Sequence, residues 1–80
     1  MPQELRNLPA TRRDVLENLP NLAEEVKQVE DWLGEKGRAV VRFSGTELKL
    51  RLMVEAETKN LVEQALNRLQ AAAQKDDILA

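Results

Sequence analysis

Five residues in a basic segment of the chain carry the clearest chemistry: Arg42, Ser44, Gly45, Thr46 and Arg51. Serine and threonine hydroxyls donate hydrogen bonds, and a glycine lets backbone N–H groups converge into an anion-binding concavity. The planar guanidinium of arginine pairs with two phosphate oxygens at once, which lysine cannot do. The spacing therefore predicts a phosphate site, although the same local pattern also fits an ordinary turn flanked by solvated arginines.

The positive charge is confined to this segment. Residues 36–51 contain five basic side chains and one acidic side chain, whereas the whole chain has 12 Lys and Arg against 14 Asp and Glu. A net charge of −2 provides no global field that attracts nucleic acid or an anionic membrane, so we expect neither as a partner. The sequence has no apolar run of membrane-spanning length and no hydrophobic signal region, and we expect a cytoplasmic protein.

The composition limits the chemistry that this chain can perform alone. It has no cysteine and no histidine, which removes thiolate chemistry, the commonest general base and the commonest transition-metal ligands. We therefore assign no catalytic residue, no metal ligand and no cofactor to this chain. Its 80 residues, of which 42% are hydrophobic and 32% charged, fit one folded domain that spans residues 1–80.

A predicted hairpin positions the five residues. Apolar and charged side chains alternate in two segments, residues 38–43 and residues 48–55. If Phe43 pairs with Leu48, residues 44–47 form the loop, and Arg42 and Arg51 lean to the same side of the sheet. The opposite face, which we expect to meet helices, carries Ala39, Val41, Phe43, Leu48, Leu50, Leu52 and Val54.

Two segments show helical spacing. In the first, Asn21 can cap the helix, Gly34 ends it, and Gly37 permits a tight turn after it. Trp32 borders the apolar stripe of this helix as a packing residue. Thr58 can cap the second helix. The apolar stripes are Leu22, Val26, Val29 and Leu33 in the first helix, and Leu61, Val62, Ala65, Leu66 and Leu69 in the second.

The remaining segments complete the predicted fold. Residues 3–8, between two prolines, predict a short edge strand. Thr11 and Asp14 predict a short helical turn that Pro20 closes. Residues 74–80 are expected to form a frayed tail. Together these segments predict an α+β fold, in which a small, largely antiparallel sheet of three or four strands packs against two main helices.

A longer stretch of the basic hairpin is similar to a known family signature. The run from Arg42 to Glu55 resembles the phosphate-binding signature of the α-D-phosphohexomutases, in which Arg, any residue, Ser-Gly-Thr-Glu-Pro and a second Arg precede a Val-Met-Val-Glu-like strand. Pro2–Asn7 and Glu30–Arg38 are similar to segments of the C-terminal domain in the bacterial phosphoglucosamine mutase branch. The resemblance covers nearly the whole chain and indicates the fourth, C-terminal domain of such an enzyme.

The chain departs from the family pattern at three positions. Phe43 and Leu48 stand where the family usually has proline, and Pro9 stands where the family's first strand continues, which leaves the extent of that strand open. Proline restricts the backbone, so its loss leaves the loop less preorganised. The rigidity of the loop, or its affinity for phosphate, is therefore expected to differ from the family's norm.

The resemblance implies a parent isomerase that interconverts glucosamine 6-phosphate and glucosamine 1-phosphate through a phosphoserine and a bisphosphorylated sugar, for cell-wall amino-sugar synthesis. In it, the substrate phosphate that is not transferred would be held by Arg42, Ser44, Gly45, Thr46 and Arg51. The chain lacks the family's phosphoserine, magnesium and sugar-recognition loops. The resemblance thus implies that three other domains supply these, Mg²⁺ included, and that this domain alone is inactive. Its partners would be the phosphosugar and those domains.

Two other hypotheses stay open. The parent could be a phosphomannomutase/phosphoglucomutase, because sugar choice resides in a domain that this sequence does not contain. Alternatively, the basic hairpin could belong to a free-standing module that binds an anion or nucleic acid. Against that module, the only aromatic residues are Trp32 and Phe43, whereas single-stranded nucleic acid is commonly bound by stacking on aromatic side chains.

Overall fold

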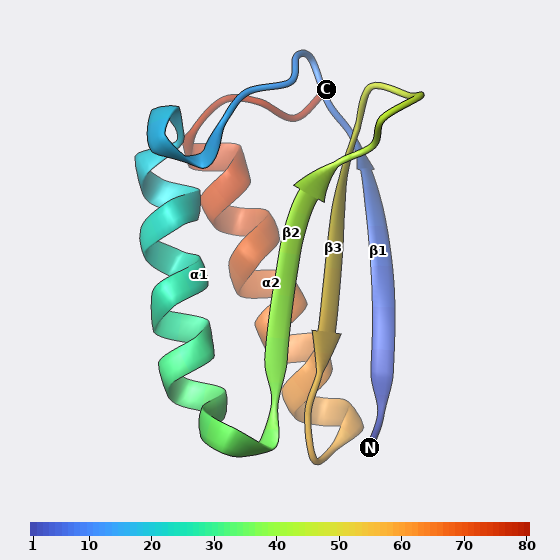
Figure 1. The fold of residues 1–80 in the computed structure, drawn as a ribbon, viewed down its shortest axis with the longest axis vertical. Helices are drawn as coiled ribbons and strands as arrows, with labels where there is room; N and C mark the ends of the chain where they lie inside the picture. The colour runs from blue at the N-terminus through green and yellow to red at the C-terminus, as the bar shows by residue number, and fades with distance from the viewer.

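Three antiparallel strands form a sheet, and two helices cover one of its faces (Figure 1). The computed structural model describes all 80 residues. The elements are β1 (Gln3–Pro9), α1 (Pro20–Leu33), β2 (Arg38–Phe43), β3 (Lys49–Glu55) and α2 (Lys59–Lys75), with short 3-10 turns at Leu16–Asn18 and Gly34–Lys36. This arrangement confirms the α+β fold with a small antiparallel sheet and two main helices. Neither helix is long and apolar enough to cross a membrane.

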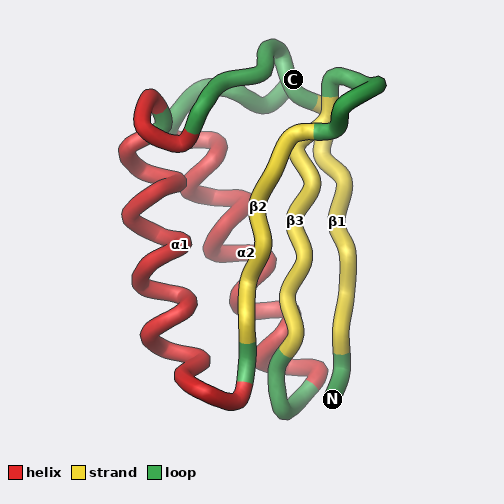
Figure 2. Tube along the Cα trace, viewed as in Figure 1, coloured by secondary structure: helices red, strands yellow, loops and turns green.

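The strand that comes last in the chain lies in the middle of the sheet. The strand order is β1-β3-β2, and both outer strands run antiparallel to β3, as Figure 2 shows. β1 is the edge strand predicted between the two prolines, and it extends one residue further than predicted, to Pro9. A proline is tolerated there because an edge strand does not need every N–H for the sheet.

The β2–β3 hairpin pairs in a different register from the predicted one. Phe43 lies opposite Leu50 rather than Leu48, so the loop runs from Ser44 to Leu48. The carbonyl of Leu48 accepts a hydrogen bond from the N–H of Ala10 at 2.9 Å, which holds Leu48 against the end of β1 instead. A shift of two residues leaves the strand residues on their predicted faces. Leu48 itself is exposed in the loop, contrary to the prediction.

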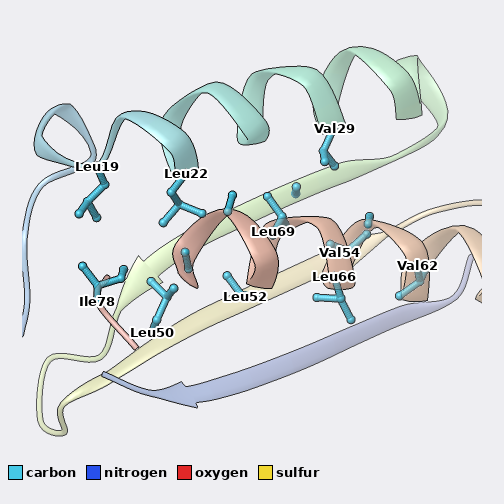
Figure 3. Packing of buried hydrophobic residues seen from close by; sticks show 14 of the residues in the cluster. Leu19, Leu22, Val29, Leu50, Leu52, Val54, Val62, Leu66, Leu69 and Ile78 are labelled. Carbon is cyan, nitrogen blue, oxygen red and sulfur yellow. The ribbon is translucent and has the colours of Figure 1, made fainter. Parts of the chain in front are cut away.

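The central strand supplies the middle of the hydrophobic core. Its alternate residues have no exposed surface: Leu50, Leu52 and Val54. Figure 3 shows these side chains together with apolar side chains of both helices. Ala39 of β2 is buried on the same face, and Val41 and Phe43 are partly buried against the cluster. The period-two pattern of both strands therefore identified the face that meets the helices.

Helix α1 begins differently from the prediction. Pro20 is its first residue rather than the end of a preceding turn, because a helix tolerates the missing N–H of proline at that position. Asn21 does not cap the helix. Instead, the carboxylate of Asp76 accepts hydrogen bonds from the backbone N–H groups of Asn21 at 3.1 Å and Leu22 at 2.7 Å. The cap therefore comes from a residue near the other end of the chain.

The turn that precedes α1 forms around Asp14 and not around Thr11. The Asp14 carboxylate accepts hydrogen bonds from the N–H of Val15 and the side-chain amide of Asn18, each at 2.9 Å. The N–H of Thr11 donates to the carbonyl of Ile78 at 2.8 Å, so Thr11 contacts the C-terminal segment. The predicted capping role of Thr11 is wrong because this long-range contact takes its place.

Two glycines serve the junction between α1 and β2 for different reasons. Gly34 has a φ of 63°, in the left-handed region that favours glycine, and it ends α1 as predicted. Gly37 is extended rather than part of a tight turn. A Cβ at Gly37 would lie 2.8 Å from the carbonyl oxygen of Glu55 and 2.9 Å from Cβ of Leu33. Close packing therefore favours glycine at this position.

Helix α2 begins as predicted, because Oγ1 of Thr58 accepts a hydrogen bond from the N–H of Leu61 at 3.2 Å. Its predicted stripe is buried at Val62, Ala65, Leu66 and Leu69, and Leu61 is partly buried. Trp32 of α1 differs from the prediction, because 42% of it is exposed. The guanidinium carbon of Arg68 lies 5.1 Å from the centre of its ring, in a cation–π contact on the helical surface.

The C-terminal residues pack onto the fold, in contrast to the frayed tail that we expected over residues 74–80. Asp77 has a φ of 56° and turns the chain after α2. Ile78 then has no exposed surface, and Leu79 pairs with Ala10 through an isolated antiparallel bridge. Removing an apolar side chain from water is favourable by about 1.5 to 3 kcal/mol, which is a reason for this segment to pack.

Candidate functional site

The five candidate residues lie on the β2–β3 hairpin, at the end of the sheet where the C-terminus also lies (Figure 1). Arg42 is in β2, Arg51 is in β3, and Ser44, Gly45 and Thr46 are in the loop between them. In the observed register, Arg42 lies directly opposite Arg51. Both alternate with the buried residues of their strands, so both lie on the face that the helices leave uncovered, as expected.

No acidic group of the chain neutralises this arginine pair. Of the seven arginines, only Arg42 and Arg51 make neither an ion pair nor a hydrogen bond within the chain. By contrast, Arg38, which lies on β2 with Arg42, forms an ion pair with Glu55 at 3.4 Å. Like charges that face each other on neighbouring strands destabilise a sheet. An anion that accepts hydrogen bonds from both guanidiniums would relieve this repulsion.

The hydroxyl of Ser44 organises the loop. Its Oγ accepts hydrogen bonds from the N–H groups of Thr46 at 3.3 Å and Glu47 at 3.2 Å. Two of the amides that we expected to converge on an anion therefore converge on this oxygen. Gly45 does not have a positive φ, and a Cβ there would meet open space, so the loop conformation itself does not require glycine. The hydroxyl proton of Ser44 remains able to donate outward.

Two hollows border the hairpin on the uncovered face of the sheet. The first has a volume of about 260 Å³ and is lined by Asn7, Ser44, Thr46, Glu47, Lys49 and Arg51. The second has a volume of about 340 Å³, and Arg42 and Arg51 both line it. Arg51 therefore borders both hollows. The structure brings Ser44, Thr46 and Arg51 together, places Arg42 in the adjoining hollow, and leaves Gly45 outside the lining of either.

Two strand residues belong to this site although the candidate set omitted them. Asn7 of β1 lies directly opposite Arg51, and Lys49 of β3 forms an ion pair with Glu47 at 3.0 Å. Both line the hollow beside the loop. Lys49 is two residues before Arg51 on the same strand, so the alternation of the sequence already placed both side chains on the same face. Asn7 could be placed only after the pairing of β1 with β3 was known.

Arg13 is a third omitted residue, and it reaches the loop from the connection between β1 and α1. Its guanidinium donates hydrogen bonds to the carbonyls of Ser44 and Glu47, each at 3.0 Å. No periodicity marks this irregular segment, so no sequence signal pointed to Arg13. Next to it, the pKa of Asp14 lies below its ordinary value because Asn18 and the N–H of Val15 donate to the carboxylate, with a smaller contribution from Arg12.

The sequence profile of one protein family matches most of the chain. It describes the C-terminal domain of phosphoglucomutase/phosphomannomutase, and the match covers residues 5–73. The chain belongs to this family. The match includes the whole hairpin with the two arginines and the Ser-Gly-Thr loop, and it confirms the family resemblance drawn from the run Arg42 to Glu55.

Individual relatives of this phosphoglucomutase/phosphomannomutase C-terminal domain carry a more specific name. The phosphoglucosamine mutase of Francisella tularensis subsp. tularensis (strain WY96-3418) is 48% identical over 61 residues, which are 76% of this chain and 14% of the relative. The phosphoglucosamine mutase of Chlamydia trachomatis serovar L2 (strain ATCC VR-902B / DSM 19102 / 434/Bu) is 44% identical over 62 residues, which are 78% of this chain and 14% of the relative. The chain thus spans about one seventh of the length of these relatives.

Proposed function

We propose that this domain binds the substrate phosphate in a phosphohexosamine mutase, which interconverts glucosamine 6-phosphate and glucosamine 1-phosphate. Family membership and the relatives named phosphoglucosamine mutase support this enzyme class. The observation that carries the binding role is the pair Arg42 and Arg51, which lie opposite each other on the uncovered face without an acidic partner. A phosphate dianion suits two adjacent guanidiniums, because each can donate two parallel hydrogen bonds to it.

The loop residues add donors to the two guanidiniums. The oxygen of Ser44 already accepts two loop N–H groups, so its hydroxyl proton is available to a phosphate oxygen. The hydroxyl of Thr46 lines the same hollow. A ligand can approach the backbone of Gly45 closely, because no side chain shields it. These groups together form a small anion site with several charge-assisted or neutral donors.

The phosphate bound here would be the one that is not transferred. Fixing one end of the sugar phosphate orients the other end at the reacting centre, and this remote binding energy contributes to the rate. A site that accepts either phosphate of a bisphosphorylated sugar also lets the intermediate reverse its orientation between two transfers. The domain thus contributes positioning rather than a reacting group.

Catalysis is assigned to other parts of the parent enzyme. Mg²⁺ takes oxygen ligands, and no group of three or more acidic side chains is arranged to hold a metal ion, so the residues of this chain do not fit Mg²⁺. By analogy with the family, we assign the phosphoserine, the Mg²⁺ ion and sugar recognition to three further domains of a cytoplasmic parent. This domain alone should not convert glucosamine 6-phosphate.

Backbone amide chemical shifts of the 80-residue chain, recorded while glucosamine 6-phosphate is added, test the proposal. A few charge-assisted hydrogen bonds, without the rest of the pocket, should give a Kd on the order of millimolar. This corresponds to a binding free energy of about 4 kcal/mol. The amides of Ser44, Gly45 and Thr46 should shift first, and glucosamine without phosphate should leave them unchanged. Shifts confined to the chain termini would contradict binding by the loop.

Lysine substitutions separate the guanidinium geometry from the charge. Arg42→Lys and Arg51→Lys should each weaken phosphate binding about tenfold, because lysine cannot donate two parallel hydrogen bonds. Arg38→Lys is the matched control: Arg38 lines the second hollow with Arg42 but is paired with Glu55, so its replacement should leave the Kd for phosphate unchanged. Equal weakening by all three, together with salt-dependent RNA binding, would favour a free-standing nucleic-acid-binding module instead.

A further inference from the structure

Arg13 spans the turn that carries the candidate phosphate-binding residues. Its Nε donates to the carbonyl of Ser44 and its Nη2 donates to the carbonyl of Glu47, both at 3.0 Å. These carbonyls belong to the first and last residues of the segment Ser44–Glu47, so one planar group connects both ends of it. Arginine is the side chain that carries donors in such a fixed, forked arrangement.

We propose that Arg13 is a positioning residue that holds Ser44–Glu47 in its phosphate-binding conformation. This inference rests on the proposed function of the loop. Arg13 lines neither hollow beside the hairpin, and two of its guanidinium nitrogens donate to loop carbonyls, so we assign it to the loop rather than to the phosphate. Arg13 raises the fraction of molecules whose loop has the conformation that binds phosphate. When that fraction falls, the apparent affinity for phosphate falls in proportion.

Four other hydrogen bonds within the hairpin hold the shape of the loop, and two of them run from the N–H groups of Thr46 and Glu47 to Oγ of Ser44. The N–H of Ser44 donates to the carbonyl of Lys49 at 2.9 Å, and the N–H of Lys49 donates to the carbonyl of Glu47 at 3.0 Å. The carbonyl of Ser44 accepts a hydrogen bond from Arg13. An exposed segment with few internal bonds opens at a low free-energy cost. The two bonds from Arg13 differ from these four because they come from outside the hairpin and tie both ends of Ser44–Glu47 to another part of the fold.

The backbone on both sides of Arg13 is itself fixed. Before it, the N–H of Ala10 donates to the carbonyl of Leu48 at 2.9 Å, and the N–H of Thr11 donates to the carbonyl of Ile78 at 2.8 Å. After it, the carboxylate of Asp14 accepts the N–H of Val15 at 2.9 Å. Arg13 thus extends from an anchored segment, which is what a side chain needs in order to restrain a neighbouring loop.

The test compares Arg13→Lys with Arg12→Lys. Both keep the charge and lose the guanidinium, but Arg12 contacts the carbonyl of Asp77 and the carboxylate of Asp14 rather than the loop. Each variant is measured by the ¹⁵N heteronuclear NOE of residues 44–47 without ligand, by the Kd for glucosamine 6-phosphate and inorganic phosphate at constant ionic strength, and by urea unfolding. We expect Arg13→Lys to lower the loop NOE and raise both Kd values about three- to tenfold. Arg12→Lys should change neither.

Each other outcome overturns a specific part of the inference. A raised Kd with an unchanged NOE would mean that Arg13 binds the phosphate directly. An unchanged Kd, with or without a lower urea midpoint, would mean that Arg13 does not position the site, while binding by the wild-type chain would leave the proposed function standing. If the wild-type chain bound neither phosphate compound, the proposed function would fail, and the role of Arg13 in binding would fail with it.

Discussion

Ser44 and Thr46 lie two positions apart and make different contacts. Oγ of Ser44 accepts hydrogen bonds from two loop N–H groups, those of Thr46 and Glu47. The hydroxyl of Thr46 makes no hydrogen bond within the chain, although the residue lines the hollow beside Arg51. Ser44 therefore shapes the loop and would also donate to a ligand in the proposed function, whereas the hydroxyl of Thr46 has no partner within the chain.

Substitution of the two residues should separate stability from binding. Ser44→Ala removes the acceptor of two hydrogen bonds, so we expect the free energy of unfolding to fall by about 1 kcal/mol and phosphate binding to weaken. Thr46→Val keeps the shape of the side chain, so stability should stay within about 0.5 kcal/mol while phosphate binding weakens. Urea unfolding and a phosphate titration of both variants provide the measurement. Equal destabilisation by the two substitutions would contradict this difference.

The N-terminus of helix α1 is capped by one side chain from the end of helix α2. The structure gives α1 no capping side chain of its own, and the carboxylate of Asp76, directly after α2, accepts the N–H groups of Asn21 and Leu22. The first N–H groups of a helix lack intrahelical partners and lie at the positive end of its dipole, and both properties favour a carboxylate there. The relative placement of the two helices is thereby fixed at this end of the molecule.

Asp76→Asn should lower the free energy of unfolding by about 1 kcal/mol, because one of the two accepting oxygens becomes a donor that faces a backbone N–H. Asp77→Asn is the matched control at the next position. Asp77 has a φ of 56°, which asparagine tolerates, and its side chain makes no hydrogen bond or ion pair, so stability should not change. Urea unfolding followed by circular dichroism compares them. Indistinguishable midpoints would show that the interhelical cap contributes nothing.

The C-terminal segment completes the hydrophobic core of the molecule. Ile78 belongs to a core cluster of 15 buried residues that draws on both helices and the sheet. A domain of this size has a total stability of about 4 to 12 kcal/mol, so each fully buried side chain carries a large share of it. The same segment also accepts the N–H of Thr11, which lies two residues before Arg13. The packing of Ile78 therefore supports the core and the connection that reaches the loop.

Ile78→Ala should destabilise the domain by about 2 to 4 kcal/mol, because it removes buried methyl groups and leaves a cavity. Val15→Ala is the control, since 59% of Val15 is exposed and its loss should change stability by less than about 0.5 kcal/mol. Thermal unfolding of both variants measures the difference. A melting temperature for Ile78→Ala close to that of Val15→Ala would contradict the packing of this segment.

The hairpin shows how far the sequence could predict the candidate site. Alternation with a period of two placed Arg42 and Arg51 on one face, because the direction of a side chain in a strand depends only on parity. Parity cannot choose between registers that differ by two residues, so the opposition of Phe43 to Leu50 and the five-residue loop depend on contacts that the alternation does not encode. One such contact is the hydrogen bond from Ala10 to the carbonyl of Leu48.

The sequence by itself determined the elements, the buried faces, the Thr58 cap and the five candidate residues, because periodicity, capping and motif spacing are local properties of a chain. Only the tertiary structure decided that Asp76 caps α1, that Arg13 donates to two loop carbonyls, and that the tail is packed. These contacts join residues that are far apart in the chain, by 31 positions for Arg13 with Ser44 and 55 for Asp76 with Asn21. A contact of that kind leaves no local pattern, because it depends on which surfaces meet when the helices pack on the sheet.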